Sequence, residues 1–214
     1  MLKRPSDPPQ PAAPLRHPDA DARRAGFHRI AGVDEAGRGP WAVPVVAASV
    51  ILHRARLPVH IDDSKRLTPL QRARAFDVIL HHADIGFGIA CAEEIDRRNI
   101  LQATLLAMRH AVLDLPATPD LVLVDGHLAP PLAGPCWPIV GGDRLSYPIA
   151  CASIMAKVFR DRLMAFYHRL EPRYAFHRHK GYGTPLHALR LKRHGPSLFH
   201  RHSFKPVLLY AEAV

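Results

Sequence analysis

Apolar runs separated by polar turns predict five β-strands in this chain. Residues 30–33 and 43–52 are apolar and lie on either side of a glycine-rich turn, and residues 85–92 alternate small and apolar side chains. Together they predict three strands that follow one another directly. Residues 121–124 and 136–140 are two further short apolar runs. A wholly apolar run of four residues that follows a helical segment is typical of a buried strand parallel to its neighbour.

Helical patterns fill the segments between and after these strands. Residues 68–81 begin with Thr-Pro, which is typical of the start of a helix. Apolar residues recur three or four positions apart over residues 101–115 and again over residues 149–170. A further helix is predicted over residues 185–194. This order of elements predicts an α/β fold in which helices cover a mixed five-stranded sheet.

The two ends of the chain differ in composition from its middle. Residues 1–27 contain six prolines and no hydrophobic period, so we expect a disordered tail ahead of one folded domain at residues 28–214. The chain has a formal net charge of +10, and residues 168–205 hold nine Lys and Arg against the single Glu171. A basic, helical C-terminal region at about residues 168–214 suits a polyanionic partner. A merely soluble basic face is the alternative.

Cysteine and histidine usage disfavours two other kinds of site. The three cysteines, Cys91, Cys136 and Cys151, lack CxxC spacing, which disfavours a disulfide framework and a cysteine-based zinc site. The fifteen histidines are interpreted as exposed residues near a basic surface rather than as zinc ligands. No apolar run reaches the ~18 residues of a membrane span, and the N-terminus lacks an apolar signal core. We expect a cytoplasmic protein, and a monomer.

Two adjacent carboxylates, Asp34 and Glu35, follow the first apolar run and precede the turn Gly37-Arg38-Gly39. Because no Lys or Arg lies within the predicted strand, their mutual repulsion favours a metal ion as the compensating charge, with a distant basic residue as the alternative. Successive side chains of a regular strand point to opposite faces. The strand must therefore twist, bulge or end at Glu35 if both side chains reach one ion, unless Glu35 contributes its main-chain carbonyl. A polar hairpin rim without chemistry is the other interpretation.

Asp125 and Asp143 share the setting of this pair, since each also follows an apolar run and lies next to a glycine. If the strands are neighbours, these acidic ends meet at one edge of the sheet. A donor set of oxygens, with no Cys or His in the same motifs, favours hard cations such as Mg²⁺ or Mn²⁺. Two such ions can activate water and stabilise the leaving oxygen in phosphodiester hydrolysis. A carboxylate cluster on a basic protein is then explained as a phosphate site.

A series of short motifs covers most of the chain. The first is Asp34-Glu35-Ala36-Gly37-Arg38-Gly39-Pro40. The later ones are Val45-Val46-Ala47-Ala48, Asp63-Ser64-Lys65-Arg66-Leu67, Val124-Asp125-Gly126, Gly142-Asp143, Ala152-Ser153-Ile154-Met155-Ala156-Lys157-Val158, Arg160-Asp161, His179-Lys180-Gly181-Tyr182 and Ser203-Phe204. In sequence and order these motifs resemble the ribonuclease HII family, over roughly residues 28–207. The resemblance implies the ribonuclease H-like fold.

The same resemblance implies an activity. The family hydrolyses the RNA strand of RNA–DNA hybrids and incises duplex DNA 5′ to an embedded ribonucleotide, which leaves a 3′-hydroxyl and a 5′-phosphate. Another nuclease of the same fold, of the junction resolvase or transposase type, is one alternative, because fold alone does not specify function. A non-catalytic basic nucleic-acid-binding protein is the other.

Roles for individual acidic residues also follow from the resemblance. The implied catalytic carboxylates, and ligands of two Mg²⁺ or Mn²⁺ ions, are Asp34, Glu35, Asp125 and Asp143. Asp161 is either a further carboxylate near this site or the ion-pair partner of Lys157, one helical turn earlier.

Substrate recognition is implied for the loop Gly37-Arg38-Gly39 together with Tyr182, which would recognise the 2′-hydroxyl that distinguishes RNA from DNA. The candidate phosphate contacts are the basic residues Lys65, Lys180 and Arg201. The family pattern has a second basic residue where this chain has His202. The contact made there is therefore expected to be pH-dependent or absent.

Overall fold

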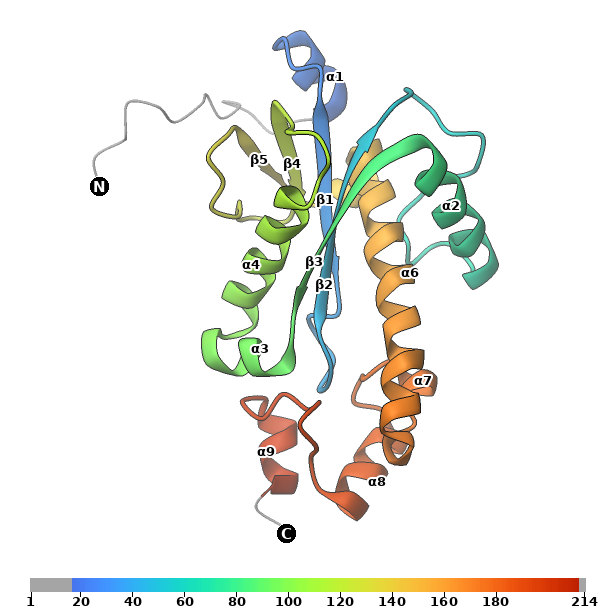
Figure 1. Ribbon diagram of the computed structural model, residues 1–214, viewed down its shortest axis with the longest axis vertical. Helices are drawn as coiled ribbons and strands as arrows, with labels where there is room; N and C mark the ends of the chain where they lie inside the picture. Colours follow the sequence, from blue (N-terminus) through green and yellow to red (C-terminus); the bar gives the residue numbers. More distant parts are fainter. Residues whose placement is uncertain (1–16, 212–214) are drawn as a thin grey trace, which may run out of the picture.

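The computed structural model describes residues 17–211, and its centre is a five-stranded sheet (Figure 1). The strands are β1 (Ile30–Ala36), β2 (Val45–Leu52), β3 (Ala83–Ala90), β4 (Leu121–Asp125) and β5 (Cys136–Ile139). Their order across the sheet is β3-β2-β1-β4-β5. The first three strands are antiparallel neighbours, whereas β4 is parallel to β1 and β5 is parallel to β4. The predicted mixed five-stranded sheet is confirmed.

The helices include all four that the sequence predicts. These are α2 (Pro69–His82), α4 (Ile100–Leu113), α6 (Tyr147–Leu170) and α8 (Pro185–His194). Shorter helical segments, which the sequence pattern did not predict individually, are α1 (Pro18–Arg24), α3 (Ala92–Arg98), α5 (Gly142–Leu145), the 3-10 turn η1 (Pro172–Tyr174), α7 (Phe176–His179) and α9 (Lys205–Ala211). Over residues 17–211, no helix combines the length and the apolar character that a bilayer span requires.

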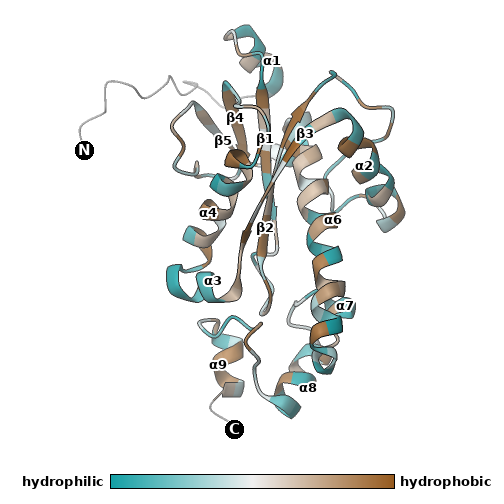
Figure 2. Cartoon of the chain, in the orientation of Figure 1, coloured by the Kyte–Doolittle hydropathy of each residue, from teal (hydrophilic) through white to brown (hydrophobic). Residues whose placement is uncertain are grey.

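Helices cover both faces of the sheet. In Figure 1, α6 packs on one face against β1 and β2, while α4 packs on the other, and α2 lies against α6. Figure 2 shows largely hydrophobic strands at the centre, between helices whose hydrophilic residues lie mainly on the sides that face away from the sheet. A Cβ atom at Gly32 would lie 2.2 Å from the carbonyl carbon of Pro148. The main chain of α6 therefore approaches β1 closely, which fixes the start of α6 beside the strand that carries Asp34.

A C-terminal module, residues 172–211, closes one end of the sheet (Figure 1). Its buried apolar residues pack together with Trp41 and Val43 of the loop between β1 and β2. Main-chain hydrogen bonds join the same parts, because Trp41 N donates to Gly181 O and Arg201 N donates to Trp41 O, both at 2.8 Å. The predicted helical C-terminal region is confirmed, and it supports the loop that follows Asp34 and Glu35.

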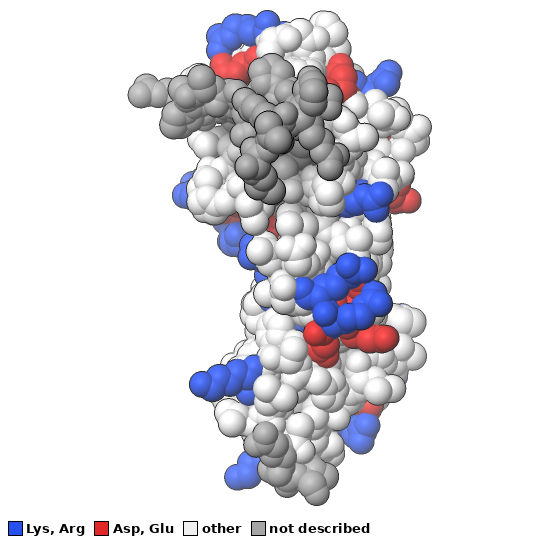
Figure 3. All heavy atoms as spheres, turned by 90° about the vertical axis from the view of Figure 1, so that its left-hand side faces the viewer, with Lys and Arg blue, Asp and Glu red and all other residues white. Residues whose placement is uncertain are grey.

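Charge on the face that carries α3 and α4 is mixed in sign. Figure 3 shows Lys and Arg side chains beside Asp and Glu side chains in one group near the middle of that face. On α3 itself, Glu94 is ion-paired with both Arg97 and Arg98. This face therefore does not present a continuous basic surface.

Three histidines of the C-terminal module are buried, which corrects the expectation of exposed histidines. They are His179, His187 and His200, of which the last two are completely buried. The His179 and His187 rings stack with their centroids 4.3 Å apart, and His187 Nε2 lies 3.0 Å from His200 Nε2. Burial, with a smaller contribution from the neighbouring histidine, lowers the pKa of His187 to about 4 and that of His200 to about 3. Both rings are neutral packing groups near pH 7.

The C-terminal module is expected to lose stability in acid. The folded-state pKa values of His187 and His200 lie below the unfolded value of ~6.5, so the unfolded chain binds more protons between them. The free energy of unfolding should be fully retained above that value and fall by about 1.4 kcal/mol per pH unit for each histidine as the pH decreases toward 4. Urea unfolding at pH 7.5, 6.0 and 5.0 measures it. His81→Asn, at an exposed histidine, should follow the wild-type profile, whereas His200→Asn should lose less stability in acid than wild type, and an unchanged profile for His200→Asn would contradict the prediction.

The disordered-tail prediction for residues 1–27 is wrong for the part that the structure describes. Helix α1 covers Pro18–Arg24, and its Ala22 is completely buried. Asp19 Oδ2 accepts a hydrogen bond of 2.8 Å from Tyr147 N, at the start of α6. The helix forms because it packs on the domain, a contact that local composition does not reveal. Residues 1–16, which the same prediction includes, lie outside the described residues.

Candidate active site

The sheet register brings Asp34 and Asp125 together. β1 and β4 are parallel, and Val33 is paired with Val124. The next residues along the two strands are Asp34 and Asp125, so these carboxylates occupy equivalent positions at the carboxyl ends of neighbouring strands. The predicted meeting of acidic strand ends is therefore found in the register itself.

Glu35 follows Asp34 without a break in the strand. β1 pairs regularly with β2 through Asp34 and Glu35 and ends one residue later, at Ala36. The expectation of a twist, bulge or end at Glu35 is thus corrected, although both side chains line the same cavity. Asp34 Oδ1 accepts a hydrogen bond of 2.7 Å from Glu35 N. Arg38 Nη1 donates to Glu35 Oε1 at 3.3 Å, so a local basic residue partly compensates the pair.

Asp143 reaches the same edge from α5. Gly142 N donates a 2.7 Å hydrogen bond to Asp125 Oδ1, which ties the start of α5 to the end of β4. Asp143 is 8% exposed. Two cations lie near its carboxylate, with Arg144 Nε 3.9 Å from Asp143 Oδ1 and Lys65 Nζ 4.0 Å from Asp143 Oδ2. The loop after β2 and the loop after β5 therefore meet at the acidic end of β4.

The electrostatics show that these carboxylates form one group. Burial raises the pKa of Asp34 well above its usual range, and repulsion from Glu35 and Asp125 raises it further. Burial also raises the pKa of Glu35, where Arg38 opposes it and Asp125 adds to it. The pKa of Asp143 is raised by burial and then by the charges of Asp125 and Asp63. A site that destabilises several carboxylates at once is typical of a cation-binding site.

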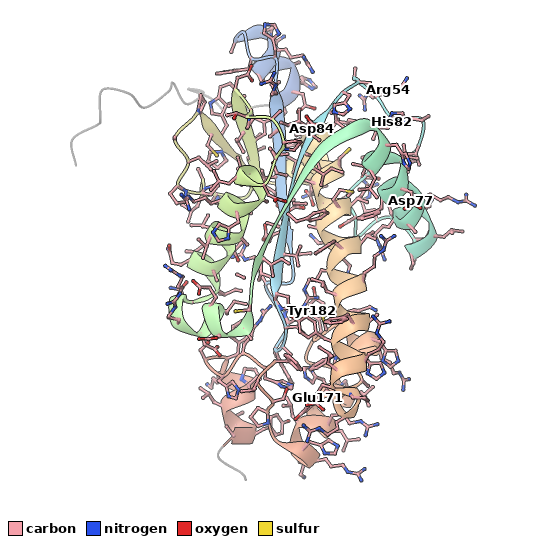
Figure 4. The ribbon with its side chains drawn as sticks, viewed as in Figure 1. Arg54, Asp77, His82, Asp84, Glu171 and Tyr182 are labelled. Atoms are coloured by element: carbon pink, nitrogen blue, oxygen red, sulfur yellow. The ribbon has the colours of Figure 1, made fainter. Side chains whose placement is uncertain are left out.

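A cavity of about 230 Å³ adjoins this acidic edge. It is lined by residues of β1, the following loop, the Ser64 loop, α6 and the C-terminal module, namely Asp34, Glu35, Ala36, Gly37, Arg38, Gly39, Ser64, Lys65, Ser153, Lys157, Arg160 and Tyr182. Figure 4 shows Tyr182 at the end of the sheet nearest the C-terminal module, between the strands and α6. A Cβ atom at Gly39 would lie 3.7 Å from Tyr182 Cε1, so Tyr182 lies directly beside the glycine loop.

The donor set fits a hard divalent cation. The grouped side chains offer carboxylate oxygens alone, which suit Mg²⁺ and Mn²⁺. Within residues 17–211, no three His, Cys, Asp or Glu side chains already have the spacing of metal ligands. Carboxylates that repel one another at close range stay ionised only when a cation offsets their charge, and otherwise one of them takes up a proton. The fit therefore rests on the chemistry and electrostatics of the group.

Three polar residues of α6 line the cavity, and none of them was placed in the site from the sequence. Ser153, Lys157 and Arg160 follow one another at spacings of four and three residues. This spacing forms a polar stripe beside the apolar face of α6 and is the signal that could have identified them. Ser153 Oγ donates to Ser64 Oγ at 3.0 Å, and the Ser153 side chain partly opposes the rise in the pKa of Asp34. The stripe places polar groups directly against the acidic edge.

The structure separates the remaining candidates. Lys157 Nζ lies 2.8 Å from Asp161 Oδ1, which supports the ion-pair interpretation of Asp161. Arg201 is completely buried and donates to main-chain carbonyls, so its proposed role as a phosphate contact is wrong. Lys180 is partly exposed, but its Nζ donates to His177 O at 2.8 Å and it is absent from the cavity lining. His202 anchors its segment through N, which donates to Asp96 Oδ2 at 2.8 Å.

The sheet order and the helices on both faces of the sheet place the chain in the ribonuclease H-like class of folds. A family model described as Ribonuclease HII matches residues 31–207. The chain therefore belongs to the ribonuclease HII family, and it is a metal-dependent endoribonuclease.

Individual relatives and solved structures agree with this assignment. Ribonuclease HII of Rhizorhabdus wittichii is 52% identical over 182 residues, which cover 85% of this chain and 90% of the relative. Ribonuclease HII of Chlamydia muridarum is 50% identical over 188 residues, or 87% and 86% of the two chains. The ribonuclease H2 structure from Pyrococcus horikoshii OT3 matches with a TM-score of 0.73 at 23% identity, over 86% of this chain and 98% of that chain. Bst-RNase HIII in complex with Mn²⁺ matches with a TM-score of 0.69 at 17% identity, over 90% and 72%. These two structures establish the shared fold.

Proposed function

We propose that the enzyme hydrolyses the RNA strand of RNA–DNA hybrids and incises duplex DNA 5′ to an embedded ribonucleotide, leaving a 3′-hydroxyl and a 5′-phosphate. The observation that carries this proposal is a single cavity whose walls are the carboxylates of β1 on one side and the Gly37–Gly39 loop with Tyr182 on the other. Phosphodiester hydrolysis requires the carboxylates. Selection of a ribose requires the glycine loop and Tyr182, because the 2′-hydroxyl must be contacted closely.

Four carboxylates would hold the metal ions. These are Asp34, Glu35, Asp125 and Asp143, for which we propose two Mg²⁺ or Mn²⁺ ions. When bound, such ions activate the attacking water and stabilise charge on the leaving oxygen. Support comes from the raised pKa values of Asp34, Glu35 and Asp143 and from the Mn²⁺ complex of Bst-RNase HIII, which has the same fold.

Basic residues around the acidic edge would bind the phosphates that flank the scissile bond. The Lys65 side chain is 81% exposed and its Nζ lies near Asp143, so it can reach a phosphate beside the carboxylates. The Arg38 side chain is 51% exposed and stands beside Glu35. Lys180 would contact the backbone further from the cavity. Each contact would orient the duplex without identifying its bases.

The decisive experiment compares two duplexes. One carries a single embedded ribonucleotide and the other is entirely DNA, and each is incubated with Mg²⁺, Mn²⁺ or a chelator. We expect cleavage only of the ribonucleotide duplex, only with metal, and with a 3′-hydroxyl and a 5′-phosphate at the nick. Cleavage of all-DNA branched junctions without a ribose would instead indicate a resolvase-like activity. Binding without cleavage under every condition would indicate a binding protein.

Tyr182→Ala is expected to weaken selection of the ribonucleotide. The Tyr182 side chain offers a ring that can stack on a sugar or base and a hydroxyl that can hydrogen-bond. Loss of such a platform should lower kcat/KM on the single-ribonucleotide duplex by about 10- to 100-fold. Tyr182→Phe keeps the ring, so it measures the hydroxyl alone. Affinity for the all-DNA duplex, measured by fluorescence anisotropy, should change little, and an equal loss on both duplexes would remove Tyr182 from ribose recognition.

A further inference from the structure

Two arginines are buried beside the glycine loop without a carboxylate partner. Arg160 is 1% exposed and Arg201 is 0% exposed, and neither forms an ion pair within residues 17–211. Burial lowers the pKa of Arg160 to about 10 and that of Arg201 to about 9. A buried charge is costly unless its hydrogen bonds are well satisfied. The fold therefore retains two cations whose burial is unfavourable, which indicates that they have a role at this place.

Within residues 17–211, five of their six hydrogen bonds are directed at one short segment, residues 37–44, and Arg160 Nη2 is buried without a partner. Arg201 donates from Nη2 to Gly37 O at 2.6 Å, from Nη1 to Arg38 O at 2.8 Å, and from Nε and Nη2 to Val43 O at 3.1 and 2.8 Å. Arg160 Nε donates to Pro44 O at 3.0 Å, and its Nη1 donates to Lys180 O at 3.0 Å. Four carbonyls of the loop between β1 and β2 thus face the two guanidinium groups.

The loop conformation depends on these contacts. Val43 has a φ of 69°, a conformation that is strained for a β-branched residue and persists only when its surroundings hold it. Its carbonyl accepts the two bonds from Arg201, and its N–H donates to Phe199 O at 2.7 Å. Both ends of this strained residue are therefore held by the segment at 199–201.

Peptide geometry links these carbonyls to the cavity. In a trans peptide the carbonyl of one residue and the N–H of the next point in opposite directions, and the described residues contain no cis peptide bonds. Because Arg201 holds Gly37 O and Arg38 O, the N–H groups of Arg38 and Gly39 must point away from it. Neither N–H donates to an acceptor within residues 17–211. Both residues line the cavity, so two free donors are available there.

We propose that Arg201, together with Arg160 behind Gly37, is a positioning residue that orients the 37–39 loop so that Arg38 N–H and Gly39 N–H are presented to an oxygen of the substrate ribose. This inference rests on the proposed ribose selection and adds the residues that enforce it. The two residues after Arg201 are held in turn by Asp96 of α3, which accepts from His202 N, Ser203 N and Ser203 Oγ at 2.6–2.8 Å. Phe204 also covers the guanidinium, 5.2 Å from its ring centroid.

Arg201→Lys tests the proposal, because an ammonium cannot span three carbonyls in the way that a planar guanidinium does. Binding is measured by fluorescence anisotropy in chelator, for a duplex with one ribonucleotide and for an all-DNA duplex. We expect the ratio of the two affinities to fall by about 10- to 30-fold, while affinity for the all-DNA duplex changes by less than about 3-fold. Thermal unfolding of each variant is recorded alongside.

Tyr174→Phe is the matched control. It removes a buried 2.6 Å hydrogen bond from the Tyr174 hydroxyl to Gly195 O in the same C-terminal module, without touching the loop carbonyls. It should lower the melting temperature and keep the affinity ratio. If it loses the ratio as Arg201→Lys does, Arg201 acts only through stability and the proposal is overturned.

Asp96→Asn serves as a milder second variant should Arg201→Lys fail to fold. It weakens the anchor of residues 202–203 and should lower the ratio by about 3-fold, whereas Asp114→Asn, which alters the carboxylate that accepts from Phe87 N at 2.9 Å, should not. Unchanged ratios for both Arg201→Lys and Asp96→Asn would overturn the positioning role alone. A wild-type enzyme without any ribose preference would instead overturn the proposed function.

Discussion

Asp34→Asn is expected to lower kcat by at least about 10³-fold and, at the same time, to stabilise the metal-free protein by about 1–2 kcal/mol. Catalysis should fall because an amide lacks the charge needed to hold a divalent cation at the centre of the acidic edge. Stability should rise because Asp34 is buried and repelled by Glu35 and Asp125, which raise its pKa. Since this folded-state pKa exceeds the unfolded one, ionised Asp34 destabilises the fold at pH 7, and asparagine removes that cost.

Metal-dependent stabilisation gives a measurement that does not depend on turnover. A ligand that binds only the folded state raises its melting temperature in proportion to the logarithm of its concentration. Mn²⁺ should therefore raise the melting temperature of the wild type and have a much smaller effect on Asp34→Asn. Hybrid binding in chelator should remain within a few-fold of wild type.

Asp120→Asn is the matched control for this variant. Asp120 precedes β4, whereas Asp125 ends it, so the control lies at the opposite end of the same strand. Burial raises its pKa, but hydrogen bonds from the N–H groups of Arg29 and His28 outweigh burial and lower it overall. Asp120→Asn should therefore destabilise the fold and spare turnover, the opposite of Asp34→Asn. Full turnover by Asp34→Asn would remove Asp34 from the catalytic group.

Long periodic segments were predictable from sequence because the pattern that predicts them also buries them. The apolar repeat over residues 149–170 matches α6, whose Ala152 and Ala156 pack against the sheet. The acidic cluster was predictable for a related reason, since a carboxylate at the end of a buried strand must lie at the edge of the sheet. Asp34 and Asp125 meet because the register of β1 and β4 is set by the apolar residues before them.

The surroundings of the site were less predictable because they depend on tertiary contacts. Arg201 is charged and lies in a basic segment, so composition favours an exposed phosphate contact, yet the folded chain buries it against carbonyls of residues far away in sequence. Helix α1 is short and proline-rich in its surroundings, and it is held by Asp19 at the start of α6. In both cases the contacting residues are distant along the chain, and no local sequence pattern predicts the contact.

Gly37→Ala is expected to damage the enzyme more than any other single methyl group added to the glycine loop. Gly37 has a φ of 101°, which is strained for a residue with a Cβ atom. That Cβ would also lie 2.0 Å from Arg160 Nε. Arg160 cannot easily move, because Nε and Nη1 are bonded to Pro44 O and Lys180 O. The free energy of unfolding should fall by about 2–4 kcal/mol.

The effect on function should exceed the effect on folding, since the displaced loop carries Arg38 and Gly39 at the cavity wall. A misplacement of about 1 Å can cost roughly 10²-fold in rate, so kcat/KM on the single-ribonucleotide duplex should fall by about that factor at a temperature where the variant is folded. Gly39→Ala is the internal comparison, because its Cβ would meet only Tyr182 Cε1 at an ordinary 3.7 Å. Its free energy of unfolding should stay within about 0.5 kcal/mol of wild type. Equal destabilisation of the two variants would show that the contact with Arg160 adds no cost at Gly37. Arg160 would then not fix the position of the loop.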